Sequence, residues 1–169
     1  HLNDMIFRKA RHEELQELMK IYNRAVSYMK ETGNPNQWND GYPGEAQIIS
    51  DIDNGYCHIA LEDGNIEAVF ALIPGDDPTY AVIEGQWLNE EPYAVVHRLA
   101  ASGRIRGIGE KCLSWSLEKY PNLRVDTHAD NKIMQTIIKR LGFSECGIIY
   151  TRNGSPRIAY QINKEGGKK

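Results

Sequence analysis

The segment 104–109 holds the residues of this chain that are best suited to binding an anion. Its sequence, Arg-Ile-Arg-Gly-Ile-Gly, falls where a strand is expected to turn into a helix. Gly107 and Gly109 let backbone N–H groups converge on a ligand, and a helix N-terminus adds unpaired donors with partial positive charge. Arg104 and Arg106 add full charges that suit phosphate. The pattern indicates an anion-binding turn, and the alternative is a tight turn whose arginines are solvated.

The charge distribution favours the same region. The whole chain has 20 Lys and Arg against 23 Asp and Glu, a net charge of −3, which excludes a general nucleic-acid surface. The stretch 97–111 is instead basic, with Arg98, Arg104, Arg106 and Lys111 against Glu110 alone. The spacing disfavours two other phosphate motifs. A P-loop needs Lys-Ser or Lys-Thr after its glycines, and a dinucleotide fingerprint needs three glycines.

Hydrophobic periodicity predicts an α/β (α+β) fold around this turn, a mixed sheet with helices on its faces. Strands at 56–61, 66–73 and 80–83 are expected to form an antiparallel meander, because turn residues separate them. Gly142 stands where a helix C-cap glycine belongs. The other expected elements are helices at 13–30, 45–52, 107–120 and 131–141, and strands at 5–10, 94–101, 123–127, 147–151 and 157–162.

Two motifs in the C-terminal half resemble those of the GNAT superfamily of acetyl-CoA-dependent N-acetyltransferases. The first is Gln/Arg-x-x-Gly-x-Gly/Ala, matched by Arg104, Gly107 and Gly109. The second is Asp-Thr-His-Ala-Asp-Asn at 126–131, followed by a helix and by Leu-Gly-Phe at 141–143. The motifs occur in the family's order, and the order of elements from 5 to 162 follows the family too.

This resemblance implies a mostly antiparallel central sheet flanked by about four helices. It also implies direct transfer of an acetyl group from acetyl-CoA to an amine through a tetrahedral intermediate. The strand before the turn would bind the pantetheine arm, the turn would bind the pyrophosphate through its backbone, and Asn131 would contact the arm from the other side. The residues implied for CoA are Leu99, Ala100, Ala101, Arg104, Ile105, Arg106, Gly107, Ile108, Gly109 and Asn131.

Three departures from the family pattern bear on the mechanism. The segment 101–104 is shorter than the family's usual approach to the turn. Many members have a tyrosine as general acid where this chain has Ile138, and some have a glutamate base where it has Val95.

Acetylation of an amine with a pKa of about 10.4 requires removal of a proton at neutral pH. His97 lies two residues after Val95, on the same side of the strand, and an imidazole suits the role of base. The alternative is a structural histidine. Glu84 and Tyr93 are further candidates. Tyr150 is expected as the acid, or else as a buried tyrosine with a bonded hydroxyl. A strand N–H, such as that of Leu99, would stabilise the oxyanion.

The sequence gives little support to metal or cysteine chemistry. His128 and Asp130 lack a third ligand, so no metal is expected, and Asp130 is expected to cap the following helix. Cys57, Cys112 and Cys146 form no Cys-x-x-Cys pair and are expected to be buried thiols in a reducing, cytoplasmic setting.

The resemblance implies that the acceptor contacts the loop 34–44. This loop holds Gln37, Trp38, Tyr42 and Pro43, of which Trp38 and Tyr42 are the candidate substrate-binding residues. Such aromatic side chains either line a binding surface or fill the core under a loop, and Trp87 has the same two interpretations. The acceptor is a small-molecule or peptide amine.

The chain is expected to form one domain over 5–163, with 1–4 as an added or frayed N-terminus and 164–169 as a frayed basic tail. No signal peptide, membrane span or nucleic-acid partner is expected, and a homodimer is left open. Two alternatives remain. One is a catalytically silent CoA- or acyl-CoA-binding regulatory module, and the other is a protein that binds nucleotide phosphates.

Overall fold

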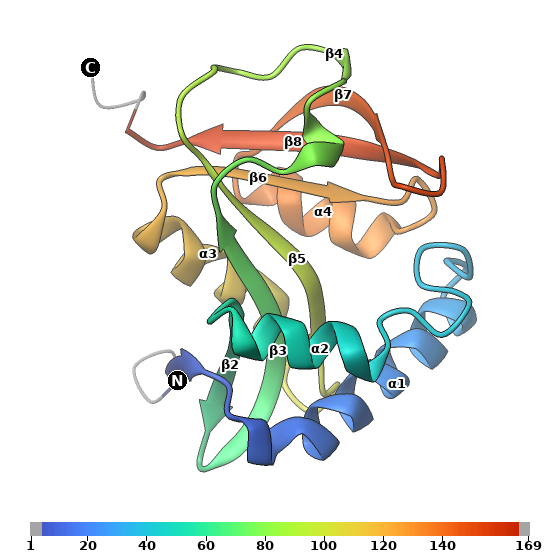
Figure 1. Cartoon of the computed structure of the whole chain (residues 1–169), viewed down its shortest axis with the longest axis vertical. Helices are drawn as coiled ribbons and strands as arrows, with labels where there is room; N and C mark the ends of the chain where they lie inside the picture. The colour runs from blue at the N-terminus through green and yellow to red at the C-terminus, as the bar shows by residue number, and fades with distance from the viewer. Residues whose placement is uncertain (1–4, 166–169) are drawn as a thin grey trace.

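The computed structural model describes residues 5–165 and contains one eight-stranded sheet with the strand order β1-β2-β3-β5-β6-β8-β7-β4 (Figure 1). All neighbouring strands run antiparallel except β5 and β6, which run parallel. The sheet is therefore mixed and mostly antiparallel, as expected. The strands are β1 (Ile6–Lys9), β2 (Cys57–Glu62), β3 (Asn65–Pro74), β4 (Glu84–Gly85), β5 (Ala94–Ala101), β6 (Asn122–Thr127), β7 (Ser144–Tyr150) and β8 (Pro156–Asn163).

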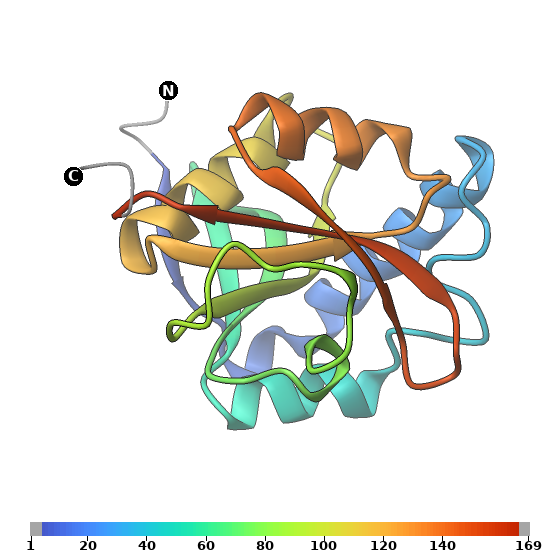
Figure 2. The ribbon, with the colours of Figure 1, turned by 90° about the horizontal axis from the view of Figure 1, so that it is seen from above.

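Helices cover both faces of the sheet (Figure 2). One face is covered by α1 and α2, and by the loop between β3 and β5, which contains the short helix η3. The opposite face is covered by α3 and α4. Three clusters of buried apolar side chains fill the layers between. The helices are η2 (His12–Glu14), α1 (Leu15–Glu31), α2 (Glu45–Asp53), η3 (Pro78–Tyr80), α3 (Ile108–Lys119) and α4 (Lys132–Arg140).

Both ends of α4 are fixed by local hydrogen bonds. Asn131 caps the N-terminus, because its Oδ1 accepts from the Met134 N–H at 3.0 Å. This corrects the expectation that Asp130 would cap the helix. Gly142 has φ +99° and begins the Schellman ending, in which the Phe143 N–H reaches the Ile138 carbonyl. The expected C-cap glycine is confirmed.

The expected strand at 80–83 is wrong. Residues 78–80 form η3, and the next pairing is a two-residue contact of β4 with β7. The reason is local: Asp77 accepts from the Thr79 N–H at 2.8 Å, and Pro78 occupies the first helical position. These two residues favour a helical turn, so β3 pairs directly with β5.

The feature that positions the site is an irregularity in β5. Arg98 and Leu99 lie opposite Phe70 alone, between the pairs His97–Ala71 and Ala100–Val69. This bulge bends β5. On its other side β5 pairs with β6 only at Ala94–Leu123 and Val95–Arg124, and the two strands then separate, as Figure 1 shows.

The Lys164 N–H donates to the Pro121 carbonyl at 2.9 Å, so order continues past the expected limit of 163. The expectations for 1–4 and 166–169 lie outside the described residues. Over residues 5–165, no helix combines the length and the apolar character needed to cross a bilayer.

Candidate active site

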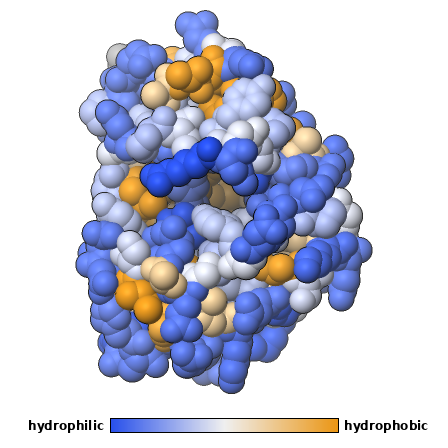
Figure 3. Space-filling model, turned by 45° about the vertical axis from the view of Figure 1, so that its right-hand side comes forward, coloured by the Kyte–Doolittle hydropathy of each residue, from blue (hydrophilic) through white to orange (hydrophobic). Residues whose placement is uncertain are grey.

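A cavity of about 850 Å³ occupies the place where β5 and β6 separate. It passes from the loop 36–42 and the turn 151–155 to the side of α3 and α4, where Leu113, Met134 and Ile138 line it. Figure 3 shows this hollow in the surface, with hydrophilic side chains around its mouth. The cavity is large enough for a small ligand, and residues from both sides of the sheet line it.

Arg98 holds the bulge in place. Its φ of +53° lies in the left-handed region, which is strained for a residue with a side chain. The guanidinium donates to both carboxylate oxygens of Asp51 on α2, each at 2.8 Å, and to the Tyr42 hydroxyl at 2.9 Å. The Arg98 carbonyl accepts from the Tyr22 hydroxyl of α1 at 2.7 Å. Contacts from two helices therefore fix the strained residue.

The Arg98 ion pair is buried. Asp51 is 2 % exposed. Burial alone would lower the pKa of Arg98, but the hydrogen bonds to Asp51 and Tyr42 outweigh it and raise this pKa. Arg98 is therefore committed to Asp51, and it does not add to the free positive charge expected from the stretch 97–111.

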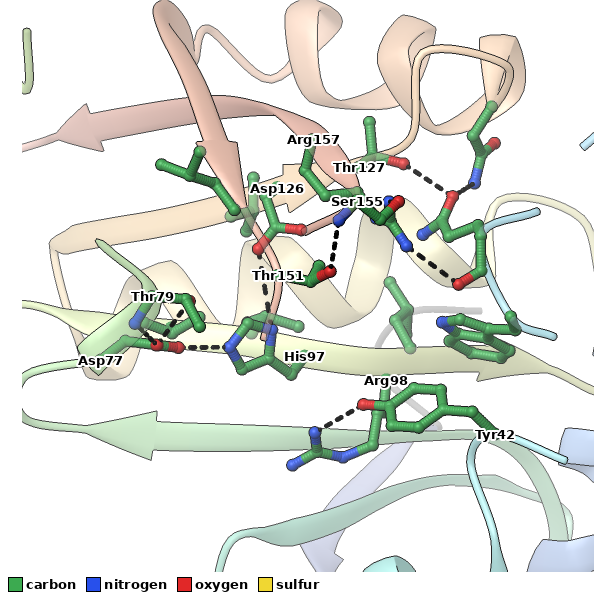
Figure 4. A pocket seen from close by; sticks show the side chains of 18 of the residues that line it. Tyr42, Asp77, Thr79, His97, Arg98, Asp126, Thr127, Thr151, Ser155 and Arg157 are labelled. Carbon is green, nitrogen blue, oxygen red and sulfur yellow. Dashed lines mark hydrogen bonds and ion pairs between the residues drawn. The ribbon is translucent and has the colours of Figure 1, made fainter. Parts of the chain in front are cut away.

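His97 stands between two carboxylates (Figure 4). Its Nε2 lies 2.7 Å from Asp77 Oδ2, and its Nδ1 lies 3.9 Å from Asp126 Oδ2. Asp126 in turn accepts from the Tyr80 hydroxyl at 2.6 Å. Asp77, His97 and Asp126 all line the cavity. The arrangement suits an imidazole that gives its Nε2–H to Asp77 and leaves Nδ1 as a proton acceptor.

Asp77 is held as a carboxylate. Burial alone would raise its pKa, but hydrogen bonds from His97 and Thr79 outweigh this effect and lower the pKa from 3.8 to about 2. The Asp77 N–H also donates to the Tyr93 hydroxyl at 2.9 Å. The carboxylate that orients His97 is itself fixed by its neighbours.

The turn before α3 keeps the geometry expected of an anion site. Gly107 is the N-cap with φ +73°, and a Cβ at this position would meet no atom within 4 Å. Arg104, however, donates to Glu67 at 3.1 Å and to the Ile66 carbonyl at 2.9 Å. Over residues 5–165 no ion pair involves Arg106 or Lys111. The free side-chain charge at this turn is therefore smaller than the sequence suggests.

Of the other residues implied for CoA, Leu99 and Asn131 line the cavity and Ala100 and Ala101 do not. Ala100 is buried against the α1 side and Ala101 packs against the α3 side. Arg24 of α1, which sequence reasoning did not single out, reaches the Ala101 carbonyl at 3.3 Å and lies over Gly103. It adds a basic group beside the turn.

Gln37 ties the loop 34–44 to the C-terminal half. Its Oε1 accepts from the side chains of Asn131 at 3.1 Å and Thr127 at 3.2 Å, and from the His128 N–H at 3.3 Å. Trp38 is buried against Tyr22 yet lines the cavity, and Tyr42 lines it with part of its ring exposed. The two candidate acceptor residues are therefore both at the cavity.

Several other candidates lie away from it. Tyr150 is 43 % exposed, and its hydroxyl contacts Glu84 at 3.1 Å, so the structure does not bring either residue to His97. Tyr93 meets the backbone of Asp77 and does not line the cavity. Trp87 is buried under the Arg124 guanidinium, 4.0 Å from its ring centroid, and fills the core.

All three cysteines are buried and free, as expected. Burial raises the pKa of Cys57 to about 12 and raises that of Cys112 and Cys146 as well. His128 Nδ1 accepts from the Asp130 N–H at 3.0 Å. Within residues 5–165 no group of three or more His, Cys, Asp or Glu side chains is arranged to hold a metal ion.

Like Arg24, the residues Asp77, Asp51 and Arg157 were not found by sequence reasoning. Asp77 had one signal, since an aspartate before Pro-Thr favours a capped turn beside a strand end. Asp51 and Arg157 had no such signal in the sequence, because their hydrogen-bond partners lie far away along the chain.

Solved structures show the same fold. A GNAT-family acetyltransferase from Streptococcus agalactiae has 36% sequence identity and a TM-score of 0.87, with 95% of each chain covered. A ribosomal-protein-alanine N-acetyltransferase from Brucella melitensis has 18% identity, a TM-score of 0.66 and coverage of 94% and 99%. A polyamine N-acetyltransferase from Drosophila melanogaster has 14% identity, a TM-score of 0.63 and coverage of 95% and 100%.

The chain belongs to the GNAT family of acetyltransferases, because the Streptococcus agalactiae relative matches it over nearly its whole length. The two more distant structures show the fold alone. No protein-family model and no curated protein sequence matches the chain.

Proposed function

We propose that this protein is an acetyl-CoA-dependent N-acetyltransferase that transfers the acetyl group directly to an amine. One observation carries the proposal: His97 lies at the strand opening, with Asp77 bonded to one ring nitrogen and the other ring nitrogen facing Asp126. The family relationship supports acetyl transfer in general, and this arrangement supplies a base for an amine acceptor.

Acetyl-CoA supplies the activated acyl group as a thioester. The separated strands leave a cavity between β5 and β6, and the first turn of α3 begins at a glycine with open space in front of it. We assign the pyrophosphate to the backbone of residues 104–109, by the anion-binding property of a helix N-terminus. Leu99, Ala100 and Ala101 are assigned to the pantetheine arm, with Asn131 on the other side.

The acceptor nitrogen attacks the thioester carbonyl and gives its proton to His97 Nδ1; the C–S bond then breaks, and the CoA thiolate leaves and takes up a proton from solvent. Asp77 fixes the tautomer in which Nδ1 holds the lone pair. The 3.9 Å between Nδ1 and Asp126 Oδ2 is too long for a direct hydrogen bond. An amine placed beside both atoms can therefore donate one hydrogen bond to each. Asp126 thereby favours an ammonium group in this position.

The Leu99 N–H is the proposed donor to the oxyanion, because the bulge takes Arg98 and Leu99 out of regular pairing with β3. Trp38 and Tyr42 are proposed to contact the acceptor from the loop side, since both line the cavity.

The test is acetyl-CoA consumption by the whole chain with a panel of primary amines, with release of free CoA measured and the acetylated product identified by mass. The proposal expects a stoichiometric acetyl-amine product. Selective stabilisation by acetyl-CoA over ATP, without product from any amine, would instead point to a catalytically silent CoA-binding module.

A further inference from the structure

Arg157 is a buried cation at the wall of the cavity without a carboxylate partner. It is the second residue of β8 and is 8 % exposed. Its Nη1 donates to the Ser155 hydroxyl and to the Pro156 carbonyl, and its Nη2 donates to the Gln37 carbonyl at 3.1 Å. All three acceptors are neutral. Among the residues that the structure describes, no carboxylate lies within ion-pair distance of this guanidinium.

The other partly or fully buried arginines are compensated. Arg98 holds Asp51 through two hydrogen bonds, and Arg8 holds Glu14 in the same way. Arg124 lies between the rings of Trp87 and Tyr93, at 4.0 and 3.9 Å from their centroids. Arg157 has neither a carboxylate nor an aromatic ring, and burial lowers its pKa. A buried charge without a counterion destabilises the folded protein unless an anion binds beside it.

The cavity therefore has groups of opposite charge along one wall. Figure 4 shows Arg157 and Asp126 together on the upper side of the cavity, with His97 below them. Asp126 is close enough to raise the pKa of Arg157 against the effect of burial. Asp77, Asp126 and His97 suit an amine, whereas Arg157 suits a planar anion that accepts from a guanidinium.

We propose that the acceptor is a small amine that also carries a carboxylate, of the amino-acid type. Its carboxylate binds Arg157 while its amine lies beside His97 and Asp126. This inference rests on the proposed N-acetyltransferase function and adds the substrate class to it. A polyamine would place a second cation near the buried guanidinium, and like charges there oppose binding.

The first experiment compares matched acceptors with the wild-type protein. Each set contains an amino acid, its carboxamide and its decarboxylated amine with the same side chain, for example leucine, leucinamide and isoamylamine. An aminoalkylphosphonate of the same length distinguishes a carboxylate from a phosphonate ligand. We expect kcat/KM for the amino acid to exceed that for the amide and the amine by roughly 10- to 100-fold, as for loss of a charged hydrogen bond. Equal or better turnover of the amide, the amine or the phosphonate would overturn the proposal.

The second experiment uses Arg157→Gln and Arg157→Lys. The glutamine variant should lose most of the ratio of kcat/KM for the amino acid to kcat/KM for the amide, and the lysine variant should keep part of this ratio. The comparison variant is Arg152→Gln, because this exposed arginine also lines the cavity and is the other cation that could hold the carboxylate; the proposal expects this variant to keep the preference. A preference lost with Arg152→Gln and kept with Arg157→Gln would contradict the assignment.

Arg157 also contacts Gln37, so folding of each variant is checked by thermal unfolding with and without acetyl-CoA. Should Arg157→Gln fail to fold, the wild-type acceptor sets and Arg157→Lys decide the question. The experiments distinguish failure of this inference from failure of the proposed function. Turnover without a carboxylate preference removes only this inference, whereas acetyl-CoA binding without turnover of any acceptor removes the proposed function as well.

Discussion

Replacement of Asp51 by Asn should destabilise the protein far more than the small change in side-chain volume suggests. Asp51 is 2 % exposed and accepts two hydrogen bonds of 2.8 Å from Arg98. Asparagine retains one acceptor oxygen but turns an NH₂ group toward the guanidinium and leaves the buried charge without a counterion. Loss of one partner of a buried ion pair costs about 3–5 kcal/mol. For a domain of this size, the midpoint of thermal unfolding should then fall by roughly 6–20 °C.

The matched control lies two residues further along the same helix. Asp53 pairs with His12 at 2.8 Å, but both side chains are more than half exposed. An exposed pair contributes at most about 1 kcal/mol, so Asp53→Asn should unfold almost as the wild type does. Urea unfolding of the three proteins measures both differences. A free energy of unfolding for Asp51→Asn within about 1 kcal/mol of the wild type would refute the view that this pair holds the bulge.

Three further results are expected. Gly107→Ala should cost about 1–2 kcal/mol, since φ is +73°, and should reduce stabilisation by acetyl-CoA in thermal unfolding. Gly64→Ala has the same open surroundings and a φ of +80° but lies at the β2–β3 turn, so it should carry a similar cost and leave the acetyl-CoA effect intact. Because the pKa of Asp77 is lowered to about 2, its ionised form adds stability above about pH 4 that is lost as the pH falls toward 2. Asp77→Asn should therefore lose less stability than the wild type between about pH 5 and pH 3 in urea unfolding, and an equal loss would argue against this role. The thiols should react with a disulfide reagent at about pH 8 only after unfolding, since all three are buried and the pKa of Cys57 is about 12. Rapid labelling of the native protein would contradict that.

The elements that the sequence predicts well are those whose signals are local. The C-terminal end of α4 follows from Gly142, which acts through the backbone within a few residues, whereas the N-cap was expected at Asp130, one residue before the actual cap, Asn131. The turn before α3 follows from its glycines in the same way. The wrong strand prediction at 80–83 also has a local cause. The apolar residues there suggested a strand, whereas Asp77 and Pro78 favour a capped helical turn over 78–80.

The parts of the site that the sequence could not give depend on contacts between distant segments. The bulge at Arg98 is stabilised by α1 and α2, which supply Tyr22 and Asp51. The partner of His97 comes from a loop 20 residues away, and nothing in the strand itself specifies it. Basic residues counted along 97–111 overestimate the free charge, because Arg98 and Arg104 have acidic partners elsewhere in the fold.

We propose that His97 acts on the amine and not on acetyl-CoA binding. The most direct test measures both acetyl-CoA binding and turnover for His97→Gln, with His12→Gln as the control because His12 pairs with the exposed Asp53 and does not line the cavity. We predict wild-type affinity for acetyl-CoA in both variants and a loss of turnover of about 10²- to 10⁴-fold in His97→Gln alone. Wild-type turnover by His97→Gln would contradict the account.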